Sequence, residues 1–458
     1  MVHNQKAQTV HLVVFLFVVF SSLLFVVLHL PLQYAFVFIF AALIFAVSFA
    51  NTNFALVILI LSMLLSPEIE AGGGASGRSV MVRIDDIFLF VIFFGWLAKM
   101  AVNKEFGLLK VTTLNRPILI YTFICFLSTL LGILQGYLNV KHSFFFLLKY
   151  VEYFLLYFMV VNNLRSVKQA KVFVFFILLT CFFVCVYAWG QIPGGERLSA
   201  PFEGRGGEPN TFAGYLLFMI SLTLGFIVYP ETKMQRLFLV CFLGFIGVVF
   251  VLTLSRGGWL AFFPMFLVII MLSKRYKVQL VAVFVSLILL SPFIFPQKVY
   301  KRVNETFAPD RSYKMMGKRI DVSESAAARI DAWSTAFARL QEKPLLGYGI
   351  PIGSVVDNQY TRVLSETGLI GFSAFLVLIV MIFRVVWTSY VQTRDNNFIQ
   401  GLCLGYLAGL VGLLFHSFSS ATFIIIRIME PFWFLTALVA ILPDIIAEEN
   451  IQGAYQHG

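Results

Sequence analysis

The chain has 458 residues, of which 60% are hydrophobic and 12% are charged, and its net charge is +11. Soluble globular proteins are roughly half apolar and a quarter charged, so this composition excludes a soluble domain and indicates a polytopic membrane protein. In such a protein an excess of Lys and Arg points first to cytoplasmic loops. The basic residues are scattered singly and form no run with interleaved aromatic residues, so no nucleic acid is expected as a partner.

The N-terminal apolar run, residues 10–30, is longer than the core of a signal peptide, and no small-residue cleavage site follows it. We therefore expect it to remain as the first membrane span. In a late run, Gly401, Gly405 and Gly409 recur at every fourth position and predict close packing of two helices. Spans need about 17–25 apolar residues, and about 12–14 runs fit. They lie near residues 10–30, 32–49, 52–66, 84–102, 116–136, 143–162, 169–190, 210–229, 236–254, 257–273, 277–295, 367–390, 397–418 and 422–442.

The loops that join these runs alternate between Lys/Arg-rich and Lys/Arg-poor. If the rich loops are cytoplasmic, both termini lie in the cytoplasm. Arg205, Arg256, Arg329 and Asp357 then all lie on the opposite side of the membrane. The assignment of sides used only the Lys/Arg content of the loops, so it did not require these four residues to share one side. We therefore expect a multi-pass protein of a bacterial cytoplasmic membrane, with a single site on its periplasmic or extracellular side and the lipid bilayer as its surroundings.

The fold class expected from this pattern is an all-α polytopic bundle with one large extracytoplasmic loop. Within this loop, Ser325–Gln341 reads as an amphipathic helix with Ile330 and Trp333 on its apolar face and Arg329 on its polar face. Four segments follow: an N-terminal bundle (1–190), central spans with the Arg205 and Arg256 motifs (191–295), the loop (296–366), and C-terminal spans with a short cytoplasmic tail (367–458).

The first polar motif, "ERLSAPFEGRGGEPNTFAGYL", surrounds Arg205 with glycines that let the backbone approach a ligand closely. Asn210 is placed to cap the helix that follows, and an arginine beside a helix N-terminus suits an anion. Glu203 and Glu208 are further candidates for contact with substrate. The alternative is a plain turn that carries solvated charges.

The second motif, "LTLSRGGWLAFF", places Arg256 between two apolar runs near the membrane boundary. An ionisable residue at such a depth is a functional candidate, and the planar guanidinium group suits phosphate oxygens. An interfacial arginine that reaches to the membrane surface is the alternative. Arg329, in "AARIDAW", is the third candidate, against the alternative of a solvated loop charge.

The last motif, "DNQYTRVLSETGLIG", offers Asp357 as a general base that deprotonates a hydroxyl group. Asn358 and Tyr360 are candidates for substrate contact. Glu366 is either a second candidate for the base or a partner that holds an arginine in place. The alternative for Asp357 or Asn358 is an N-terminal helix cap.

Three arginines with few carboxylates on one face suit a diphosphate leaving group, because guanidinium groups neutralise the charge that develops as its bond breaks. No Asp-x-Asp or His cluster points to a metal, and no Walker or Rossmann motif points to a nucleotide or other cofactor. The donor is therefore expected to arrive already activated, and a polyprenyl-diphosphate-linked glycan fits.

From about Arg197 to the C-terminus the chain resembles the O-antigen polymerase/ligase superfamily of Wzy/WaaL-type membrane glycosyltransferases. The resemblance rests on "RGGEPNTFAGYLL", "LTLSRGGWLAF", "RIDAWSTAFARLQEKPLLGYGI" and "DNQYTRVLSETGLIGF". It implies a GT-C-like bundle and a metal-independent, inverting transfer from an undecaprenyl-diphosphate-linked oligosaccharide to a glycan acceptor. A flippase and a chain-length regulator are candidate partners. The resemblance also implies that Arg205, Arg256 and Arg329 bind the donor diphosphate.

The sequence departs from the ligases of this superfamily in its last motif, which begins with Asp357-Asn358 where ligases typically have His-Asn. This departure favours a polymerase, which moves the growing chain onto a lipid-linked repeat unit. A ligase that attaches a glycan to lipid A-core, another polymer or a protein is the second hypothesis. A membrane transporter is the alternative of another class, although transporters tend to carry broken helices and polar groups near the midplane.

Overall fold

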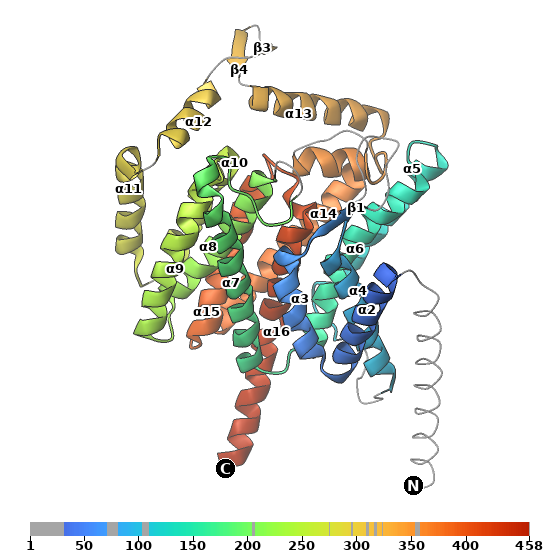
Figure 1. Ribbon diagram of the computed structural model, residues 1–458, viewed down its shortest axis with the longest axis vertical. Helices are drawn as coiled ribbons and strands as arrows, with labels where there is room; N and C mark the ends of the chain where they lie inside the picture. Colours follow the sequence, from blue (N-terminus) through green and yellow to red (C-terminus); the bar gives the residue numbers. More distant parts are fainter. Residues whose placement is uncertain are drawn as a thin grey trace. The chain divides into compact units, whose positions relative to one another are not determined.

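The computed structural model describes residues 32–70, 81–102, 110–203, 207–273, 275–294, 296–307, 311–315, 318–322, 324–352 and 358–457. Their regular secondary structure is helical apart from two short antiparallel hairpins (Figure 1). One pairs β1 (Glu68–Glu70) with β2 (Met81–Arg83), and the other pairs β3 (Arg311–Met315) with β4 (Lys318–Val322). The predicted all-α polytopic fold class is therefore confirmed. The first predicted span, residues 10–30, lies outside the described residues.

The chain divides into two compact units. The smaller one comprises residues 1–56 and 86–107, with α2 (Leu32–Ala50), the start of α3 (Thr52–Leu65) and most of α4 (Ile84–Val102). Within it the Ser48 hydroxyl donates to the Ile92 carbonyl oxygen at 2.8 Å. This bond joins α2 to α4.

The larger unit, residues 57–85 and 108–458, contains the remaining helices. They are α5 (Asn115–Leu134), α6 (Val140–Asn163), α7 (Val167–Gly190), η1 (Ile192–Gly194), α8 (Pro209–Val228), α9 (Lys233–Leu252), α10 (Arg256–Leu272), α11 (Lys277–Ile294), α12 (Gln297–Phe307), α13 (Glu324–Glu342), α14 (Gln359–Gln392), α15 (Asn397–His416), η2 (Thr422–Ile424) and α16 (Ile426–His457).

Among the described residues, eight helices are long and apolar enough to cross a membrane, judged by length and composition. Four shorter apolar helices accompany them: Ile39–Ala50, Thr52–Leu65, Arg256–Leu272 and Lys277–Leu290. The eight long helices coincide with eight of the predicted spans, and the remaining predicted spans correspond to shorter apolar helices, to α4 or to residues outside the described ones. Polar caps define several of the starts: the side chains of Ser166, Thr232 and Asn396 each accept a backbone N–H of the first turn.

The centre of the larger unit is the pair α8 and α15, whose apolar stretches are 94% and 83% buried. Their approach depends on glycine. A Cβ atom on Gly405 would lie 2.6 Å from the Leu222 Cα atom of α8. The predicted close packing along the Gly401–Gly409 ladder is therefore confirmed, with α8 as the partner.

Helix α14 is broken at Gly368, whose φ of 63° and ψ of −162° are not helical. The span predicted near residues 367–390 begins at this break, and the helix extends before it to Gln359. Residues 344–349 insert beside the break and bond to its free backbone groups, which would otherwise be unpaired. The bonds are Leu369 N to Pro344 O (2.8 Å), Ile370 N to Leu345 O (3.1 Å), Tyr348 N to Ser365 O (3.0 Å) and Gly349 N to Glu366 O (2.8 Å).

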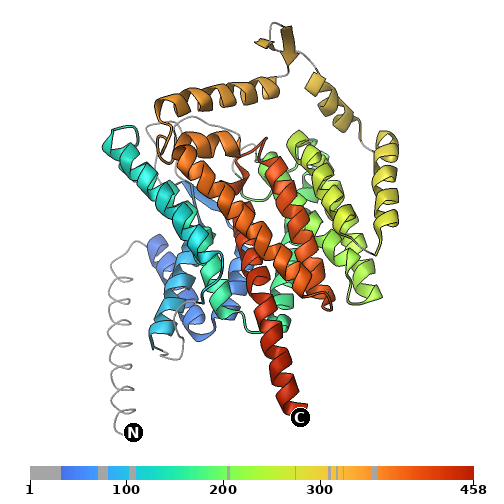
Figure 2. The same ribbon diagram turned by 180° about the vertical axis from the view of Figure 1, so that it is seen from behind.

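One end of the larger unit carries most of the polar segments, and we call it the loop face. It holds residues 191–203 and 207–208, α12, the β3–β4 hairpin and α13, which lie at the upper end of Figure 1. Seen from behind, α13 runs above the start of α14, and α5 lies beside α14 (Figure 2). The amphipathic helix predicted at Ser325–Gln341 is confirmed as α13, whereas the sequence analysis did not identify α12 or the hairpin.

Candidate active site

Arg197 joins three elements at the loop face. Its Nε atom donates to the Thr253 carbonyl oxygen at the end of α9, and its Nη2 atom donates to Asn210 Oδ1 at the start of α8, both at 3.0 Å. Burial, and then the charges of Arg302 and Arg256, lower the pKa of Arg197 to about 10. Three arginines from separate elements are therefore close enough to repel one another.

Arg256 is the first residue of α10, which is capped by the Ser255 hydroxyl accepting the Gly258 N–H at 3.3 Å. The two glycines of the Arg-Gly-Gly sequence are needed for packing. A Cβ atom on Gly257 would overlap Ser419, and one on Gly258 would lie 2.9 Å from Ala213 Cβ. This tight fit holds the start of α10 against α8 and against the turn after α15.

Two further arginines act on Arg256 through their charges: Arg302 of α12 and Arg329 of α13. Arg302 also forms an ion pair with Glu305, with 2.7 Å between Nη1 and Oε2. Lys298 of α12 donates to the Gly195 carbonyl oxygen at 2.9 Å, which holds α12 beside residues 191–197. Arg302 was not predicted from the sequence as a site residue. The one sequence feature that indicates it is a basic, amphipathic segment directly after an apolar run.

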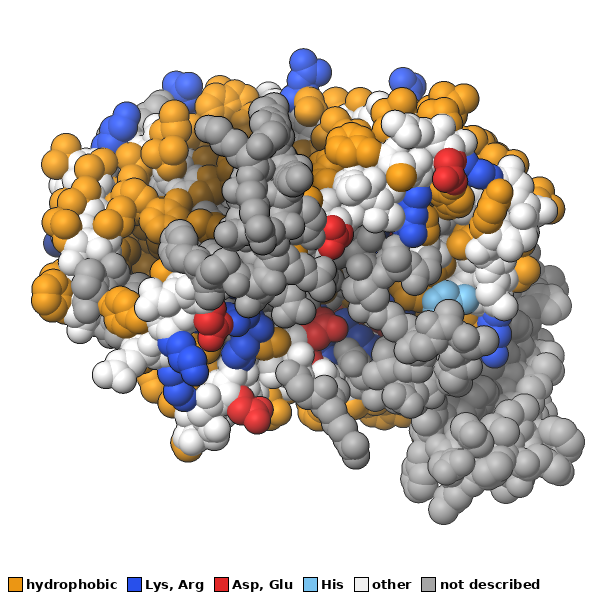
Figure 3. Space-filling model, turned by 90° about the horizontal axis from the view of Figure 1, so that it is seen from above, with side chains coloured by type: hydrophobic (Ala, Val, Ile, Leu, Met, Phe, Trp, Pro, Cys, Tyr) orange, Lys and Arg blue, Asp and Glu red, His pale blue; other side chains and the backbone are white. Residues whose placement is uncertain are grey.

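We call Arg197, Arg256, Arg302 and Arg329 the arginine cluster. Bringing like charges together is unfavourable, and an anion in their midst removes the repulsion. Donors placed around such an anion would also stabilise negative charge that forms during a reaction. The charge of the cluster suits an anion, and its members come from four different segments of the chain. On the face seen in Figure 3, basic and acidic side chains lie near one another over the middle and lower part of the view.

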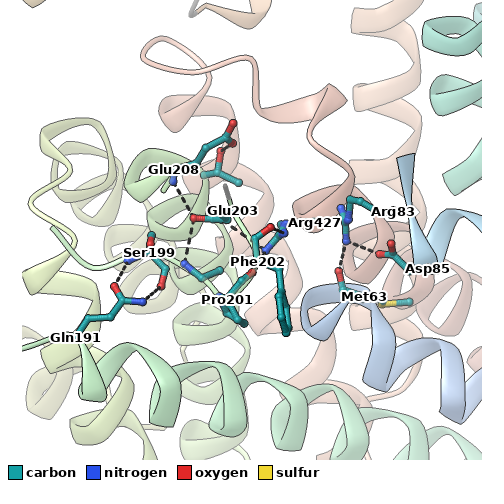
Figure 4. A network of polar contacts seen from close by, with 12 residues as sticks. Met63, Arg83, Asp85, Gln191, Ser199, Pro201, Phe202, Glu203, Glu208 and Arg427 are labelled. Atoms are coloured by element: carbon teal, nitrogen blue, oxygen red, sulfur yellow. Dashed lines mark hydrogen bonds and ion pairs between the residues drawn. The ribbon is translucent and has the colours of Figure 1, made fainter. Parts of the chain in front are cut away.

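Glu203 closes the segment that precedes Arg205 (Figure 4). Its Oε2 atom accepts the backbone N–H groups of Ala200 (3.1 Å) and Glu208 (2.8 Å). Its Oε1 atom lies 3.7 Å from Arg427 Nη1, and the side chain is 2% exposed. Burial raises the pKa of Glu203 to about 7, although Arg427 opposes this rise. The predicted substrate contact therefore also fixes the fold of its own loop.

Arg427, in the first turn of α16, binds the loop that contains Glu203. Its Nη1 and Nη2 atoms donate to the carbonyl oxygens of Pro201 (2.7 Å) and Phe202 (3.0 Å), as Figure 4 shows. Phe202 has a φ of 61°, a conformation that non-glycine residues rarely adopt. Glu208 is the N-cap residue of α8 and accepts the Thr211 hydroxyl at 2.8 Å in the first turn, so the prediction that Asn210 caps this helix is wrong. The sequence analysis did not place Arg427 in the site.

Asn358 is the N-terminal cap of α14. Its Oδ1 atom accepts the N–H groups of Tyr360 (2.9 Å) and Thr361 (3.2 Å), and its Nδ2 atom donates to the Phe418 carbonyl oxygen at 3.1 Å. The Tyr360 hydroxyl donates to the Leu414 carbonyl oxygen at 2.6 Å. Both predicted contacts with substrate thus fasten the start of α14 to the end of α15.

Glu366 lies just before the break in α14 and is 1% exposed. Its Oε1 atom is 3.0 Å from Arg362 Nε and accepts the Ile352 N–H at 3.3 Å, while its Oε2 atom accepts the Tyr150 hydroxyl at 3.1 Å. This arrangement matches the role of a carboxylate that holds an arginine in place. Two other predicted residues, Arg205 and Asp357, lie outside the described residues.

The fold defines a polytopic membrane protein, and a cluster of arginines lies at one end of its apolar helix bundle. A model of the O-antigen ligase family (Wzy_C) matches residues 239–376. This match confirms the predicted resemblance to the Wzy/WaaL-type superfamily, and it supports a role of the glycan ligase or polymerase type. The matched segment contains Arg256, Arg302 and Arg329, whereas the loop that surrounds Arg205 precedes it. No curated protein matches the chain.

Proposed function

We propose that this protein is a polysaccharide polymerase that transfers a growing glycan from undecaprenyl diphosphate to a lipid-linked repeat unit. The observation that carries the proposal is the arginine cluster, three of whose members lie within the segment that matches the O-antigen ligase family. A diphosphate carries the concentrated negative charge that such a cluster stabilises. Arg205, in the motif beside Glu203, is proposed to complete the diphosphate site.

The proposed reaction is a single displacement that needs no metal ion. The acceptor hydroxyl oxygen attacks the anomeric carbon, the bond from this carbon to the diphosphate oxygen breaks, and its electron pair stays with the diphosphate. The hydroxyl proton passes to a base, and the anomeric configuration inverts. Asp357 is the proposed base, since both carboxylate oxygens of Glu366 already accept bonds from within the protein.

The site is proposed to face the periplasm or the cell exterior, with both termini in the cytoplasm. Lys168, Lys233 and Lys277 lie in the first turns of α7, α9 and α11, at the ends of these helices away from the arginine cluster. Basic residues at that end support a cytoplasmic assignment for it. The cluster then lies on the side where lipid-linked repeat units would be presented after export.

A ligase is the second candidate, because the matching family model describes O-antigen ligases. Asp357-Asn358 in place of His-Asn favours the polymerase. The broken helix α14 is a feature of many transporters. Here, however, residues 344–349 bond to the backbone groups at the break, so these groups are not offered to a transported ion.

The test is complementation of a bacterial host that lacks its own polymerase, read on a polysaccharide gel. Wild type is expected to restore a ladder, and Arg256→Ala to leave only single capped units. The matched control is Arg394→Ala, which removes an exposed arginine at the opposite end. A normal ladder from Arg256→Ala would contradict the diphosphate site. Attachment of preformed polymer without a ladder would identify a ligase. Turnover of lipid-linked glycan in proteoliposomes without an ion gradient would exclude a transporter.

A further inference from the structure

A second polar site lies beside the loop that Arg427 holds. It is a cavity of about 170 Å³ in the larger unit, and its lining comes from four segments of the chain. Each of them contributes a charged side chain, and the fourth runs from the end of η2 into the first turn of α16. The lining residues are Arg83, Lys149, Glu208, Thr211, residues 424–426 and Arg427.

The charges at this cavity are nearly balanced, which separates it from the arginine cluster. Arg83 is 3% exposed, donates to the Met63 carbonyl oxygen and pairs with Asp85, as Figure 4 shows. Arg427 Nη1 lies 3.7 Å from Glu203 Oε1. Carboxylates therefore lie behind both guanidinium groups of the lining, and Glu208 places another carboxylate in the lining itself.

A cavity of this kind offers fixed donors and acceptors side by side. Guanidinium and ammonium groups only donate hydrogen bonds, and an ionised carboxylate only accepts them, whereas a hydroxyl group does both. A ligand rich in hydroxyl groups can therefore bond to every part of the lining, while a compact anion would meet Glu208. The volume is below the roughly 300–1,000 Å³ of sites for drug-sized ligands, so it suits one sugar ring and not an oligosaccharide.

Lys149 is the lining residue that lies farthest from the start of its own helix. It lies nine residues after the start of α6, a helix apolar enough to cross a membrane, and hence about 14 Å along its axis. An ionisable side chain within such an apolar helix is costly to bury, and in functional sites it faces a cavity or the bundle interior. Here it lines the cavity together with Thr211 of α8.

We propose that the cavity lined by Arg83, Lys149, Glu208, Thr211 and Arg427 binds one uncharged sugar ring of the glycan. All five residues lie outside the segment that matches the O-antigen ligase family, residues 239–376. The arginine cluster, with three members inside that segment, would perform the transfer step, and this cavity would select the sugar. The inference rests on the proposed function for the kind of sugar, but its binding can be measured without any transfer.

The experiment measures binding to the purified full chain in nanodiscs. One probe is the lipid-free repeat-unit oligosaccharide released from the host polymer, and the other is undecaprenyl diphosphate. Lys149→Met is expected to weaken oligosaccharide binding about tenfold, the loss of one hydrogen bond from a charged donor. Thr211→Val, which keeps the shape of the side chain, is expected to weaken it about fivefold. Neither should change binding of undecaprenyl diphosphate, which also shows that the variants are folded.

The control is Lys141→Met, which removes an exposed lysine from the same helix, two turns before Lys149. It should bind both probes like wild type. Unchanged oligosaccharide affinity in Lys149→Met and Thr211→Val would overturn the proposal. Loss of undecaprenyl diphosphate binding instead would also overturn it, because the cavity would then belong to the diphosphate site.

A transfer assay separates the two sources of the sugar. A raised KM for the lipid-linked repeat unit that accepts the chain assigns the cavity to the acceptor. A raised KM for the polymer donor assigns it to the sugar next to the diphosphate, and either result supports the site. If wild type binds the oligosaccharide through these residues but extends no polymer, only the proposed polymerase function fails.

Discussion

Substitutions of Glu366 can distinguish two roles for this side chain: a carboxylate that stabilises the fold, and a catalytic base. The wild-type side chain is 1% exposed and serves three partners: Arg362, Tyr150 and the backbone N–H of Ile352. Glu366→Ala removes all three interactions and leaves the Arg362 guanidinium, 12% exposed, without this carboxylate. Glu366→Gln keeps the shape and one acceptor oxygen, but it removes the charge.

The magnitude follows from these contacts. Removing one partner of a buried ion pair costs about 3–5 kcal/mol, since the other charge stays buried without compensation. Each of the two further hydrogen bonds contributes about 1 kcal/mol. Glu366→Ala should therefore lower the free energy of unfolding by about 5–7 kcal/mol. At roughly 2 °C per kcal/mol for a large chain, Tm should fall by about 10 °C or more. The Tm of Glu366→Gln should lie between the Tm of the alanine variant and that of wild type.

The assay is thermal unfolding of the purified variants in one detergent, followed by intrinsic fluorescence, beside the complementation gel. The control is Glu231→Ala, which removes an exposed partner of Lys171 and should change Tm by no more than about 1 °C. A Glu366→Ala variant with the Tm of wild type would refute the structural role. A Glu366→Gln variant that is stable but makes no polymer would assign the base to Glu366 instead of Asp357.

Two further predictions concern the loop face. Because the pKa of Glu203 is raised to about 7 in the folded state from an ordinary value of 4.5, the folded protein binds more protons between these values, and its stability should fall as pH rises through that window. The loss should be about 3 kcal/mol at most, and Glu203→Gln should flatten the dependence of Tm on pH. Arg302→Gln should raise the KM for the donor about tenfold by removing one cation from the diphosphate site, whereas Lys301→Gln, the exposed neighbour, should not. An equal effect of both substitutions would indicate general attraction to charge and not a defined contact.

The parts of the fold that depend on local sequence patterns could be predicted from the sequence. Apolar runs of sufficient length predicted the spans, and the spacing of Ile330 and Trp333 predicted α13 to within one residue at either end. The glycine ladder predicted a close helix contact, but not its partner. Each of these signals lies within one segment of the chain, which is why it can be read without the structure.

The sequence could not show features that depend on partners far along the chain. The break at Gly368 is stabilised by hydrogen bonds from residues 344–349. A glycine within an apolar run does not predict that a distant segment will insert beside it. Arg427 binds carbonyl oxygens more than 220 residues earlier, at Pro201 and Phe202. Arg302 joins the cluster only because α12 folds back over residues 191–197.

Backbone strain links the two arginine motifs that the sequence singled out. Among the described residues, the non-glycine residues with positive φ are Phe202 and Leu254, at 61° and 53°. Phe202 comes three residues before Arg205 and Leu254 two before Arg256. Such conformations cost about 1–3 kcal/mol each and persist only where the surroundings hold them.

An arginine side chain holds each of these strained turns. Arg427 donates to the carbonyl oxygen of Phe202, and Arg197 donates to that of Thr253, the residue before Leu254. These two arginines therefore hold the backbone at Phe202 and at Thr253, shortly before the motifs that contain Arg205 and Arg256. Catalysis by fixed charges requires that the charges be in place before the reaction, because moving them during the reaction would consume the stabilisation that they provide. The strained turns at Phe202 and Leu254, each held by an arginine, meet this requirement. The hydrogen bonds that offset their strain form without bound substrate.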